Sequence, residues 1–585
     1  MYSHFGQGCI HCRVNFDLMS APGIRKWRAF MEEATDLVVS YGGSISGEHG
    51  DGQSKAEFLY KMFGTEMIEA FREFKSIWDP DWKMNPGKIV DPYRIDENLR
   101  LGANYHPRNP STYFKFPEDH GSFAHAALRC VGVGKCRREN GEGEQDTMCP
   151  SYMVTREEMH STRGRAHLLW EMLHGDVIRE GWRDEHVKEA LDLCLSCKGC
   201  KGDCPVNVDV ATYKAEFLAQ YWQGRLRPRP AYAFGWIDKW ARFASIAPGF
   251  VNLFTQLPVL SRMAKWAAGI PEQRKIPAFA AETFQSWFRK REPRNQDRPT
   301  VILWPDTFNN HFKPETAQAA VHVLEAAGYQ VEVPQWHLCC GRPLYDYGFL
   351  AMAKSYLEGI MTTLGSQIEA GTPMVVLEPS CCSVFRDELK GIFPESMRAK
   401  RLMAHTFTLA EFLEKKAVGY ELPKLKRKAI VQGHCHHKAI MRLKEEKQVM
   451  EKMALDFTIL ESGCCGMAGS FGYEKDKYAV SIKAGERALL PQVRKAGLST
   501  LIVADGFSCK EQIEQQTNRR ALHLAEVLAM ALENGPHGPG GTYPEEHVIG
   551  PRVKGQRQVM KRAGLIIGTA VALAVAFGLV WSKRK

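Results

Sequence analysis

Four cysteines within eleven residues form the most informative motif of this chain. The segment reads Cys194-Leu-Ser-Cys197-Lys-Gly-Cys200-Lys-Gly-Asp-Cys204-Pro205, which is C-x2-C-x2-C-x3-C-P. Thiolates spaced in this way can converge on one cube of iron, and the last cysteine, held away by the proline, usually reaches a different cluster. A zinc knot is the alternative, but zinc sites normally separate two pairs by a long spacer. The spacing therefore predicts an iron–sulfur cluster and one-electron transfer.

The other cysteines also occur in groups. The chain has 17 cysteines in 585 residues, and it is too long to need a disulfide framework. Cys339-Cys340-Gly341 recurs 125 residues later as Cys464-Cys465-Gly466, and Cys382 recurs 127 residues later as Cys509. This repetition indicates two similar halves around one site, with metal ligation in a reducing compartment. The remaining members of the groups are Cys130, Cys136, Cys149, Cys381 and Cys435.

Histidines and a carboxylate occur in two glycine-rich stretches near the start of the chain. His4 and His11 lie seven residues apart, and Glu48 and His49 stand together in a second stretch. Two histidines and one carboxylate can bind a divalent metal with open coordination positions, which leaves His49 as a base beside it. A purely structural histidine pair is the alternative. Cys9 and Cys12 form a C-x2-C pair, which we expect to be ordinary buried thiols.

The length and composition allow three or four domains of ordinary globular type. The net charge of +10 is spread along the chain, and we expect no nucleic-acid partner. The spacing of Met67, Phe71, Phe74 and Trp78 predicts one helical face that packs in a core. The regions that we expect are 1–100 of mixed strands and helices, 101–225 with two cysteine groups, 226–296 as a helical connector, 297–535 as an α/β region, and 536–562 as a basic linker.

The region 297–535 alternates short apolar strands with helices, which argues for parallel α/β architecture. A helical stretch is expected over Pro314–Ala327. The expected strands are Val301–Trp304, Met374–Leu377, Ile430–Gln432 and Leu501–Ala504.

The C-terminal tail contains a long uncharged segment. Ala563–Trp581 has 19 residues without a charge, and at about 1.5 Å per residue it just spans a hydrocarbon core of about 30 Å. This segment predicts a single-pass transmembrane anchor, with the bulk of the protein in the cytoplasm.

The first region resembles the C-terminal, substrate-capping half of FAD-linked 2-hydroxyacid dehydrogenases. The resemblance rests on His4 to His11, on Ser46-Gly47-Glu48-His49-Gly50 and on Asn85-Pro86-Gly87-Lys88-Ile89. It implies that His4, His11 and Glu48 bind a zinc-like metal that holds the substrate, and that His49 takes the hydroxyl proton. It also implies cofactor contact by Asn85. The flavin-binding domain of the family is missing from this sequence, so we expect another domain or subunit to hold most of the FAD.

The second region resembles bacterial two-cluster ferredoxin domains. The usual crossing of ligands would give one cluster Cys194, Cys197, Cys200 and Cys149. The other would have only Cys130, Cys136 and Cys204, because Val133 stands where a further thiol is expected. Three thiolates leave three outcomes open: a three-iron cluster, a cluster completed by a non-cysteine ligand, or no cluster.

The region of roughly 300–520 resembles the cysteine-rich CCG domain found in heterodisulfide reductases and in one component of anaerobic glycerol-3-phosphate dehydrogenase. Its second repeat is complete, whereas the first has Thr307 where the leading cysteine would be. The resemblance implies an iron–sulfur or other metal centre in the second half, and leaves the first half open. Tight buried Cys-Cys-Gly loops without a metal are the alternative. The complete set is Cys435, Cys464, Cys465 and Cys509; the partial set is Cys339, Cys340, Cys381 and Cys382.

The histidines around Cys435 allow two interpretations. His434, His436 and His437 are ligands or proton donors near a quinone, or they are exposed residues at a helix start.

Together these features predict a multidomain α/β and α+β protein: a partial FAD-oxidase C-terminal cap, an α-helical ferredoxin domain, a duplicated α/β CCG domain and a C-terminal transmembrane helix. The predicted function is oxidation of a D-2-hydroxyacid at a metal and FAD, with electrons relayed through the clusters to a membrane quinone. The competing prediction is a non-catalytic electron-transfer and anchoring subunit that serves a separate flavoprotein.

Overall fold

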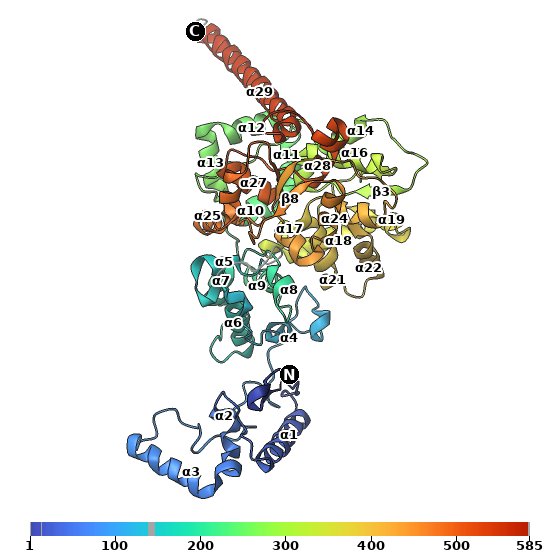
Figure 1. Cartoon of the computed structure of the whole chain (residues 1–585). Coiled ribbons are helices and arrows are strands. Elements are labelled where there is room, and N and C mark those ends of the chain that lie inside the picture. Colours follow the sequence, from blue (N-terminus) through green and yellow to red (C-terminus); the bar gives the residue numbers. More distant parts are fainter. Residues whose placement is uncertain (1, 13, 139–146, 583–585) are drawn as a thin grey trace. The chain divides into compact units, whose positions relative to one another are not determined.

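The computed structural model describes residues 2–12, 14–138 and 147–582. Its contacts divide the chain into two compact units, Met1–Pro107 and Arg108–Lys585. Figure 1 follows the chain from the N-terminal unit in blue to helix α29 in red.

The N-terminal unit combines a small hairpin with three helices. The side chain of Ser20 caps helix α1 by accepting a hydrogen bond from Gly23 N at 3.2 Å. Arg28 on α1 pairs with Glu57 at 2.6 Å and Asp96 at 2.9 Å, and so ties the helix to the rest of the unit. The elements are β1 Tyr2–His4, β2 Cys9–His11, α1 Ala21–Ser40, α2 Gly52–Lys55 and α3 Leu59–Trp78.

The predicted buried face of helix α3 is wrong. Met67 is 46% exposed, Phe74 is 65% exposed and Trp78 is 70% exposed. The helical spacing is present, but within the described residues of this unit nothing covers these three side chains. Helical periodicity indicates an apolar face, and it does not determine which other element packs on that face.

The second unit begins with a helical region that carries the first cysteine groups, followed by the helical connector. Its helices are α4 Phe123–Leu128, α5 Pro150–Thr155, α6 Thr162–His174, α7 Glu185–Asp192, α8 Gly199–Asp203, α9 Val210–Tyr221, α10 Arg229–Gly235, α11 Ile237–Ala244, α12 Pro248–Gln256, α13 Pro258–Ala268 and α14 Phe284–Lys290.

Two parallel sheets follow, as the alternation of apolar strands and helices predicted. The first has strand order β4-β3-β5-β6 and the second β8-β7-β9, and every pairing between their strands is parallel. The predicted strands are present, with ends shifted by up to two residues. The strands are β3 Thr300–Leu303, β4 Gln330–Glu332, β5 Met374–Val375, β6 Thr406–Phe407, β7 Lys428–Val431, β8 Asp456–Ile459 and β9 Leu501–Val503.

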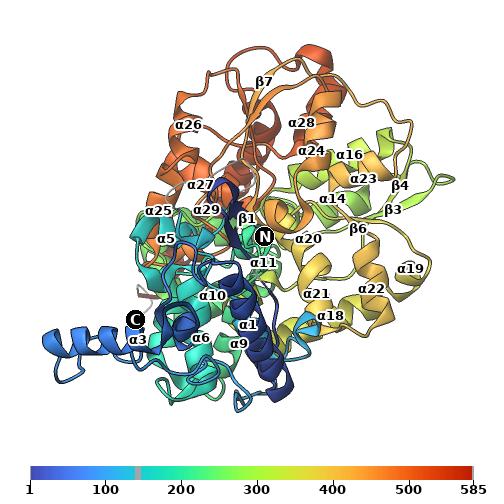
Figure 2. The same cartoon turned by 60° about the horizontal axis from the view of Figure 1, so that its bottom comes forward.

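The two sheets and their covering helices share a core. Apolar side chains of β3, β7 and β9 belong to a single core, and helices α16 and α28 pack together across the two halves (Figure 2). The helices are α15 Thr307–His311, α16 Pro314–Ala326, α17 Arg342–Asp346, α18 Leu350–Thr363, α19 Gly365–Glu369, α20 Pro379–Ser383, α21 Leu389–Ile392, α22 Met397–Ala404, α23 Leu409–Lys415, α24 Lys444–Lys452, α25 Tyr478–Glu486, α26 Leu489–Lys495, α27 Phe507–Gln516 and α28 Leu524–Asn534.

The halves repeat the spacing between strand ends and site residues. Thr307 and Cys435 each follow the end of a strand by four residues (307 − 303 and 435 − 431). Cys381 and Cys509 each follow one by six residues (381 − 375 and 509 − 503). The predicted correspondence of Cys382 with Cys509 is therefore wrong, and Cys381 takes that place. Since the carboxyl ends of parallel strands meet at one edge, each half gathers these residues at one place.

The predicted C-terminal transmembrane helix is also wrong. The uncharged segment is the second half of the 38-residue helix α29, Glu545–Ser582. The first half of this helix packs on α12, and Arg552 pairs with Glu315 at 2.7 Å. Within the described part of the chain, no helix combines the length and apolar character that crossing a membrane requires. An uncharged run does not reveal that it continues a polar helix packed on the protein. The localisation drawn from it, a single-pass anchor with the bulk in the cytoplasm, is wrong with it.

We expect Gly466→Ala to be much more damaging than Gly341→Ala, although both glycines follow a Cys-Cys pair. Both have positive φ, 86° and 76°, which costs a non-glycine residue roughly 1 kcal/mol or more. A Cβ at Gly466 would lie 2.1 Å from Ser481 O, whereas at Gly341 the nearest atom is 3.4 Å away. Overpacking typically adds about 1–3 kcal/mol. Thermal unfolding followed by tryptophan fluorescence measures the order, and equal melting temperatures would contradict it.

Candidate functional site: a histidine cluster and three cysteine sets

The hairpin β1–β2 brings His4, Cys9 and His11 to one face of the N-terminal unit. His4 lies directly opposite Cys9 in the antiparallel register, and His11 lies two residues further along the same strand. Opposed residues, and residues two apart, share a face of a sheet. Gly8, with φ 69°, provides the left-handed turn residue that precedes β2.

Glu48 completes this histidine cluster. Its Oε2 lies 2.6 Å from His4 Nδ1, and its Oε1 lies 3.4 Å from His11 Nε2 and 3.1 Å from His49 Nε2. One ligand atom from each of His4, Cys9, His11 and Glu48 falls within 4.8 Å of the others. The side chain of His11 is 12% exposed and that of His4 is 54% exposed. The cluster is thus anchored on one side and open to solvent on the other, as a substrate-binding metal site requires.

The expectation that Cys9 and Cys12 are buried thiols is wrong. Cys12 is exposed, and Cys9 is half-buried with its Sγ 3.2 Å from His11 Nε2. A Cβ on Gly47 would lie 2.5 Å from that sulfur, so only glycine fits there. The alternation of Cys9 with His11 along the strand is the signal that could have placed Cys9 in the cluster. Asn85 is exposed, with φ 48°.

In the second unit, Cys194, Cys197 and Cys200 are all buried around the turn that joins α7 to α8. Ser196 and Lys198 have positive φ, 52° and 60°, which winds the turn tightly. The segment before Cys149 crosses this turn: a Cβ on Gly199 would lie 3.0 Å from Met148 N. Asp203 fixes the crossing, because its Oδ2 accepts hydrogen bonds from Thr147 N at 2.6 Å and Met148 N at 2.8 Å.

A second set of thiols lies next to this turn. Cys130 interacts electrostatically with Cys136 and Cys204. Cys149 hydrogen bonds to Cys136 and lowers the pKa of the Cys136 thiol. Cys149 Sγ also accepts a hydrogen bond from Thr162 N at 2.9 Å. The polar contacts of Cys149 thus go to the second set, while its chain segment adjoins the first, and its assignment to the first cluster stays a prediction.

The second half of the duplicated α/β region gathers all four of its cysteines. Cys464 hydrogen bonds to Cys435 and Cys465, and Cys509 hydrogen bonds to Cys465. The bonds from Cys464 and Cys509 hold the pKa of Cys465 well below its usual value. All four side chains are buried. Four convergent buried thiols fit an iron–sulfur centre.

This four-cysteine set touches the ferredoxin-like turn directly. Cys197, Cys435 and Cys464 pack in one small apolar cluster with Leu195 and Phe471. Cys435 is also the first electrostatic neighbour of the Cys197 thiol. Spacing within the sequence could not reveal this contact, because 238 residues separate Cys197 from Cys435 (435 − 197).

The first half repeats the same arrangement with one replacement. Thr307 Oγ1 lies 3.5 Å from Cys339 Sγ, and Cys340 Sγ contacts Cys381 Sγ at 2.8 Å. Thr307 therefore occupies the place of Cys435. The backbone N–H of Gly341 donates to Cys339 Sγ at 3.4 Å, as that of Gly466 does to Cys464.

Cys382 lies apart from this first-half set. It is fully buried, and Glu411 and Arg386 act on its thiol.

The histidines beside Cys435 are buried, so the interpretation as exposed residues is wrong. His434, His436 and His437 are each 3% exposed or less. Arg342 donates to His436 Nε2 at 3.3 Å, which leaves the proton on Nδ1, 3.8 Å from Cys435 Sγ. Burial, with Arg342 beside it, holds the pKa of His436 well below its usual value. His436 is therefore a neutral donor toward the sulfur.

Arg342 is a functional residue that the motifs did not indicate. It follows the first Cys-Cys-Gly loop, and its guanidinium donates to Ser196 O at 3.0 Å in the ferredoxin-like turn as well as to His436. One buried side chain therefore links the first half, the second half and the turn.

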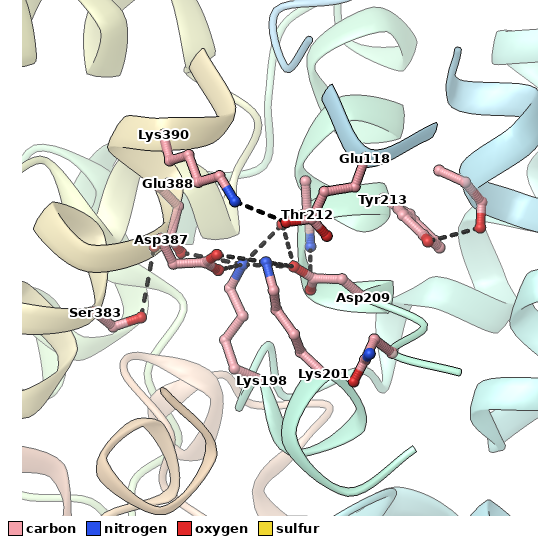
Figure 3. Close-up of polar contacts among 12 residues, drawn as sticks. Glu118, Lys198, Lys201, Asp209, Thr212, Tyr213, Ser383, Asp387, Glu388 and Lys390 are labelled. Atoms are coloured by element: carbon pink, nitrogen blue, oxygen red, sulfur yellow. Dashed lines mark hydrogen bonds and ion pairs between the residues drawn. The ribbon is translucent and has the colours of Figure 1, made fainter. Parts of the chain in front are cut away.

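Lys198 fixes the same turn from the other side. Its Nζ lies 2.9 Å from Asp209, 2.8 Å from Asp387 and 3.5 Å from Glu388, and the side chain is 2% exposed (Figure 3). Burial alone would lower the pKa of Lys198, but the three carboxylates outweigh it and raise that pKa well above its usual value. Lys201 contacts Asp387 beside it. The cation thus joins the cysteine turn to helix α9 and to the π-helical segment Val384–Glu388 of the first half.

Three family models match separate parts of the chain. Residues 1–89 match FAD linked oxidases, C-terminal domain; residues 126–208 match a 4Fe-4S dicluster domain; and residues 306–386 match a cysteine-rich domain. The resemblances inferred from the motifs are confirmed. The third match falls on the first of the two halves.

Among known proteins, the chain is 26% identical over 582 residues to a D-2-hydroxyglutarate dehydrogenase of Pseudomonas putida, which covers 90% of the chain and 55% of that protein. It is 29% identical over 293 residues to the third component, designated C, of the anaerobic glycerol-3-phosphate dehydrogenase of Escherichia coli, with 48% of the chain and 72% of that protein covered. The glycolate oxidase iron-sulfur subunit of Escherichia coli is 22% identical over 416 residues, with 69% and 94% covered. The chain therefore spans about half the length of the D-2-hydroxyglutarate dehydrogenase that it matches.

An exchange at the two equivalent positions tests the cysteine sets. Thr307→Cys completes four thiols in the first half, so iron bound per chain should rise by roughly one cluster and a new paramagnetic signal should appear on reduction. Cys435→Thr makes the opposite change in the second half and should remove one centre. Iron and sulfide analysis with electron paramagnetic resonance measures both. Unchanged iron in Thr307→Cys would show that the first half cannot hold a cluster even with the missing thiol supplied.

We expect Lys198→Met to destabilise the second unit by about 3–5 kcal/mol, because it leaves buried carboxylates uncompensated. Lys390→Met is the matched control: Lys390 pairs with Glu118 at 2.7 Å at the exposed rim of the same cluster, where a pair contributes about 0–1 kcal/mol. Thermal unfolding and the spectrum of the reduced protein measure the difference. Equal melting temperatures would contradict a structural role for the buried cation.

Proposed function

We propose that this chain carries the substrate-side metal site and the iron–sulfur centres of a flavin-dependent D-2-hydroxyacid dehydrogenase. The observation that supports this best is the convergence of His4, His11 and Glu48 beside His49, in the unit that matches the C-terminal domain of FAD linked oxidases. The alignments with D-2-hydroxyglutarate dehydrogenases cover this unit and the cysteine-rich remainder together, at about 90% of the chain.

The donor set of the histidine cluster fits a divalent metal such as zinc. Two imidazole nitrogens and one carboxylate are ordinary zinc ligands, and three protein ligands leave positions for substrate. We propose that the substrate's carboxylate and α-hydroxyl occupy these positions, on the exposed side of the cluster. The Cys9 sulfur is close enough to adjust the metal's affinity without being required as a ligand.

His49 is the proposed base. Its Nε2 lies 3.1 Å from Glu48 Oε1, so the carboxylate orients the ring and leaves the other nitrogen to take the hydroxyl proton. The side chain is 65% exposed, as a base that meets an incoming substrate must be. When bound, a flavin accepts the α-hydrogen with its electron pair, and iron–sulfur clusters accept electrons singly. We propose that Asn85 contributes to the flavin contact and that another domain or subunit holds the rest of the FAD.

The cysteine sets provide a route for the electrons. We assign one four-iron cluster to Cys194, Cys197, Cys200 and Cys149, and a second site to Cys130, Cys136 and Cys204. From the first cluster the route crosses the contact between Cys197 and Cys435 into the complete set of the second half. This contact removes the need for a separate carrier between the two regions.

A second candidate function is an electron-transfer subunit that serves a separate flavoprotein. It is favoured by the alignments with single components of the glycerol-3-phosphate dehydrogenase and of the glycolate oxidase. The two candidates differ in the histidine cluster, which the second leaves without a catalytic role.

Histidine variants distinguish them. His4→Ala should lose both the bound metal and hydroxyacid oxidation, measured by metal analysis and by dye reduction with the flavin-binding part supplied. His49→Ala should keep the metal and lose about 10²–10⁴ in rate, because it removes only the base. His106→Ala, an exposed histidine of the same unit, is the control and should change neither. Full activity in both His4→Ala and His49→Ala would favour the electron-transfer subunit, and equal metal loss in both would overturn the division of roles.

A further inference from the structure

A pocket of about 400 Å³ opens in the second unit beside Cys339. Helices α11 and α18 form its sides, and the loop before Cys339 forms its inner end. The wall is mostly apolar, and Phe243 at the rim is 65% exposed. A concave apolar pocket of this volume is of the size that binds small organic molecules. The proposed route of electrons gives no role to this pocket.

The inner end of the pocket is polar. Tyr356 donates a hydrogen bond to Asp238 Oδ2 at 2.8 Å. His337 Nε2 lies 3.6 Å from the same oxygen, which is beyond hydrogen-bond distance, and this buried atom has no hydrogen-bond partner among the described residues. An imidazole nitrogen is therefore available at the end where Cys339 lies. A ligand with an apolar ring and a polar oxygen would match both parts of the pocket.

The pocket adjoins the cysteine sets through continuous contacts. Cys339 lines the pocket and belongs to the first-half set with Cys340 and Cys381. Glu378 caps helix α20, which carries Cys381, and its Oε2 accepts a hydrogen bond from Phe507 N at 2.8 Å. Phe507 begins helix α27, which carries Cys509 of the complete set. The pocket thus lies at the far end of the duplicated region from the ferredoxin-like turn in terms of these contacts.

We propose that this pocket binds the electron acceptor, a flat, apolar ring compound of quinone type, with an oxygen directed at His337. The inference rests on the proposed function, which supplies the electrons from hydroxyacid oxidation. The balance is simple: the acceptor gains two electrons, delivered singly through the cysteine sets, and two protons from solvent, so that its two carbonyl groups become hydroxyl groups. No protein bond forms or breaks. A hydrophilic anion such as ferricyanide would gain nothing from the apolar wall.

Gly359 on α18 allows the pocket to be filled without disturbing the fold. It lines the pocket, and an added Cβ would meet no atom within 4 Å. Gly359→Phe should therefore occupy the pocket, and Phe is also a better helix former than glycine. The matched control is Gly550→Phe on α29, where a Cβ also meets nothing within 4 Å and which does not line the pocket.

The experiment uses the cluster-loaded chain, reduced with dithionite and freed of excess reductant. Reoxidation by menadione is followed in an anaerobic stopped-flow instrument, and ferricyanide is the comparison oxidant. We expect Gly359→Phe to lower kcat/KM for menadione at least tenfold while ferricyanide reoxidation stays at the wild-type rate, and Gly550→Phe to match wild type with both. Ser355→Leu, on the same wall, should give a smaller loss in the same direction.

A wild-type menadione rate in Gly359→Phe would overturn the proposal. An equal loss with menadione and ferricyanide would overturn it as well, because the change would then act on the electron supply rather than on acceptor binding. No hydroxyacid or flavin takes part in this assay, so its result is independent of whether the proposed dehydrogenase activity is correct.

Discussion

The buried ammonium group of Lys198 is the constraint on which the second unit depends. A cation held among Asp209, Asp387 and Glu388 cannot move without leaving carboxylates unpaired in a medium of low polarity. Because Lys198 stands between Cys197 and Gly199, its attachment fixes the cysteine turn against the first half of the α/β region. A weaker, exposed pair at this place would let the turn and the sheet edges shift relative to one another.

With the turn fixed, the cysteine sets form one connected series. Arg342 adds a second attachment, from the first Cys-Cys-Gly loop to Ser196 and to His436 beside Cys435. Both attachments use long cationic side chains, which reach across a junction while the thiols themselves remain in apolar surroundings. Electron transfer needs short gaps and little reorganisation, and a buried, cross-linked junction provides both.

The duplicated halves show how one arrangement serves two purposes. Strand ends, Cys-Cys-Gly loops and helix starts place Thr307, Cys339, Cys340 and Cys381 as they place the complete set of the second half. Replacement of one thiol by a hydroxyl removes a strong iron ligand, and it is on this half that the pocket beside Cys339 opens. The complete half is buried and adjoins the electron source, whereas the incomplete half is accessible to a small molecule.

The sequence by itself determined the kinds of chemistry and the architecture that supports them. Cysteine spacing indicated the clusters, and alternating strands indicated the parallel sheets, because short-range spacing controls local geometry. It misplaced the exposed face of α3, the tail helix and the partner of Cys509, since periodicity and apolar runs do not specify what packs against them. Only the tertiary structure brought Cys197 to Cys435, Arg342 to His436 and Lys198 to Asp387. These contacts join residues far apart in the chain, and they arise from the packing of whole domains, which no local pattern records.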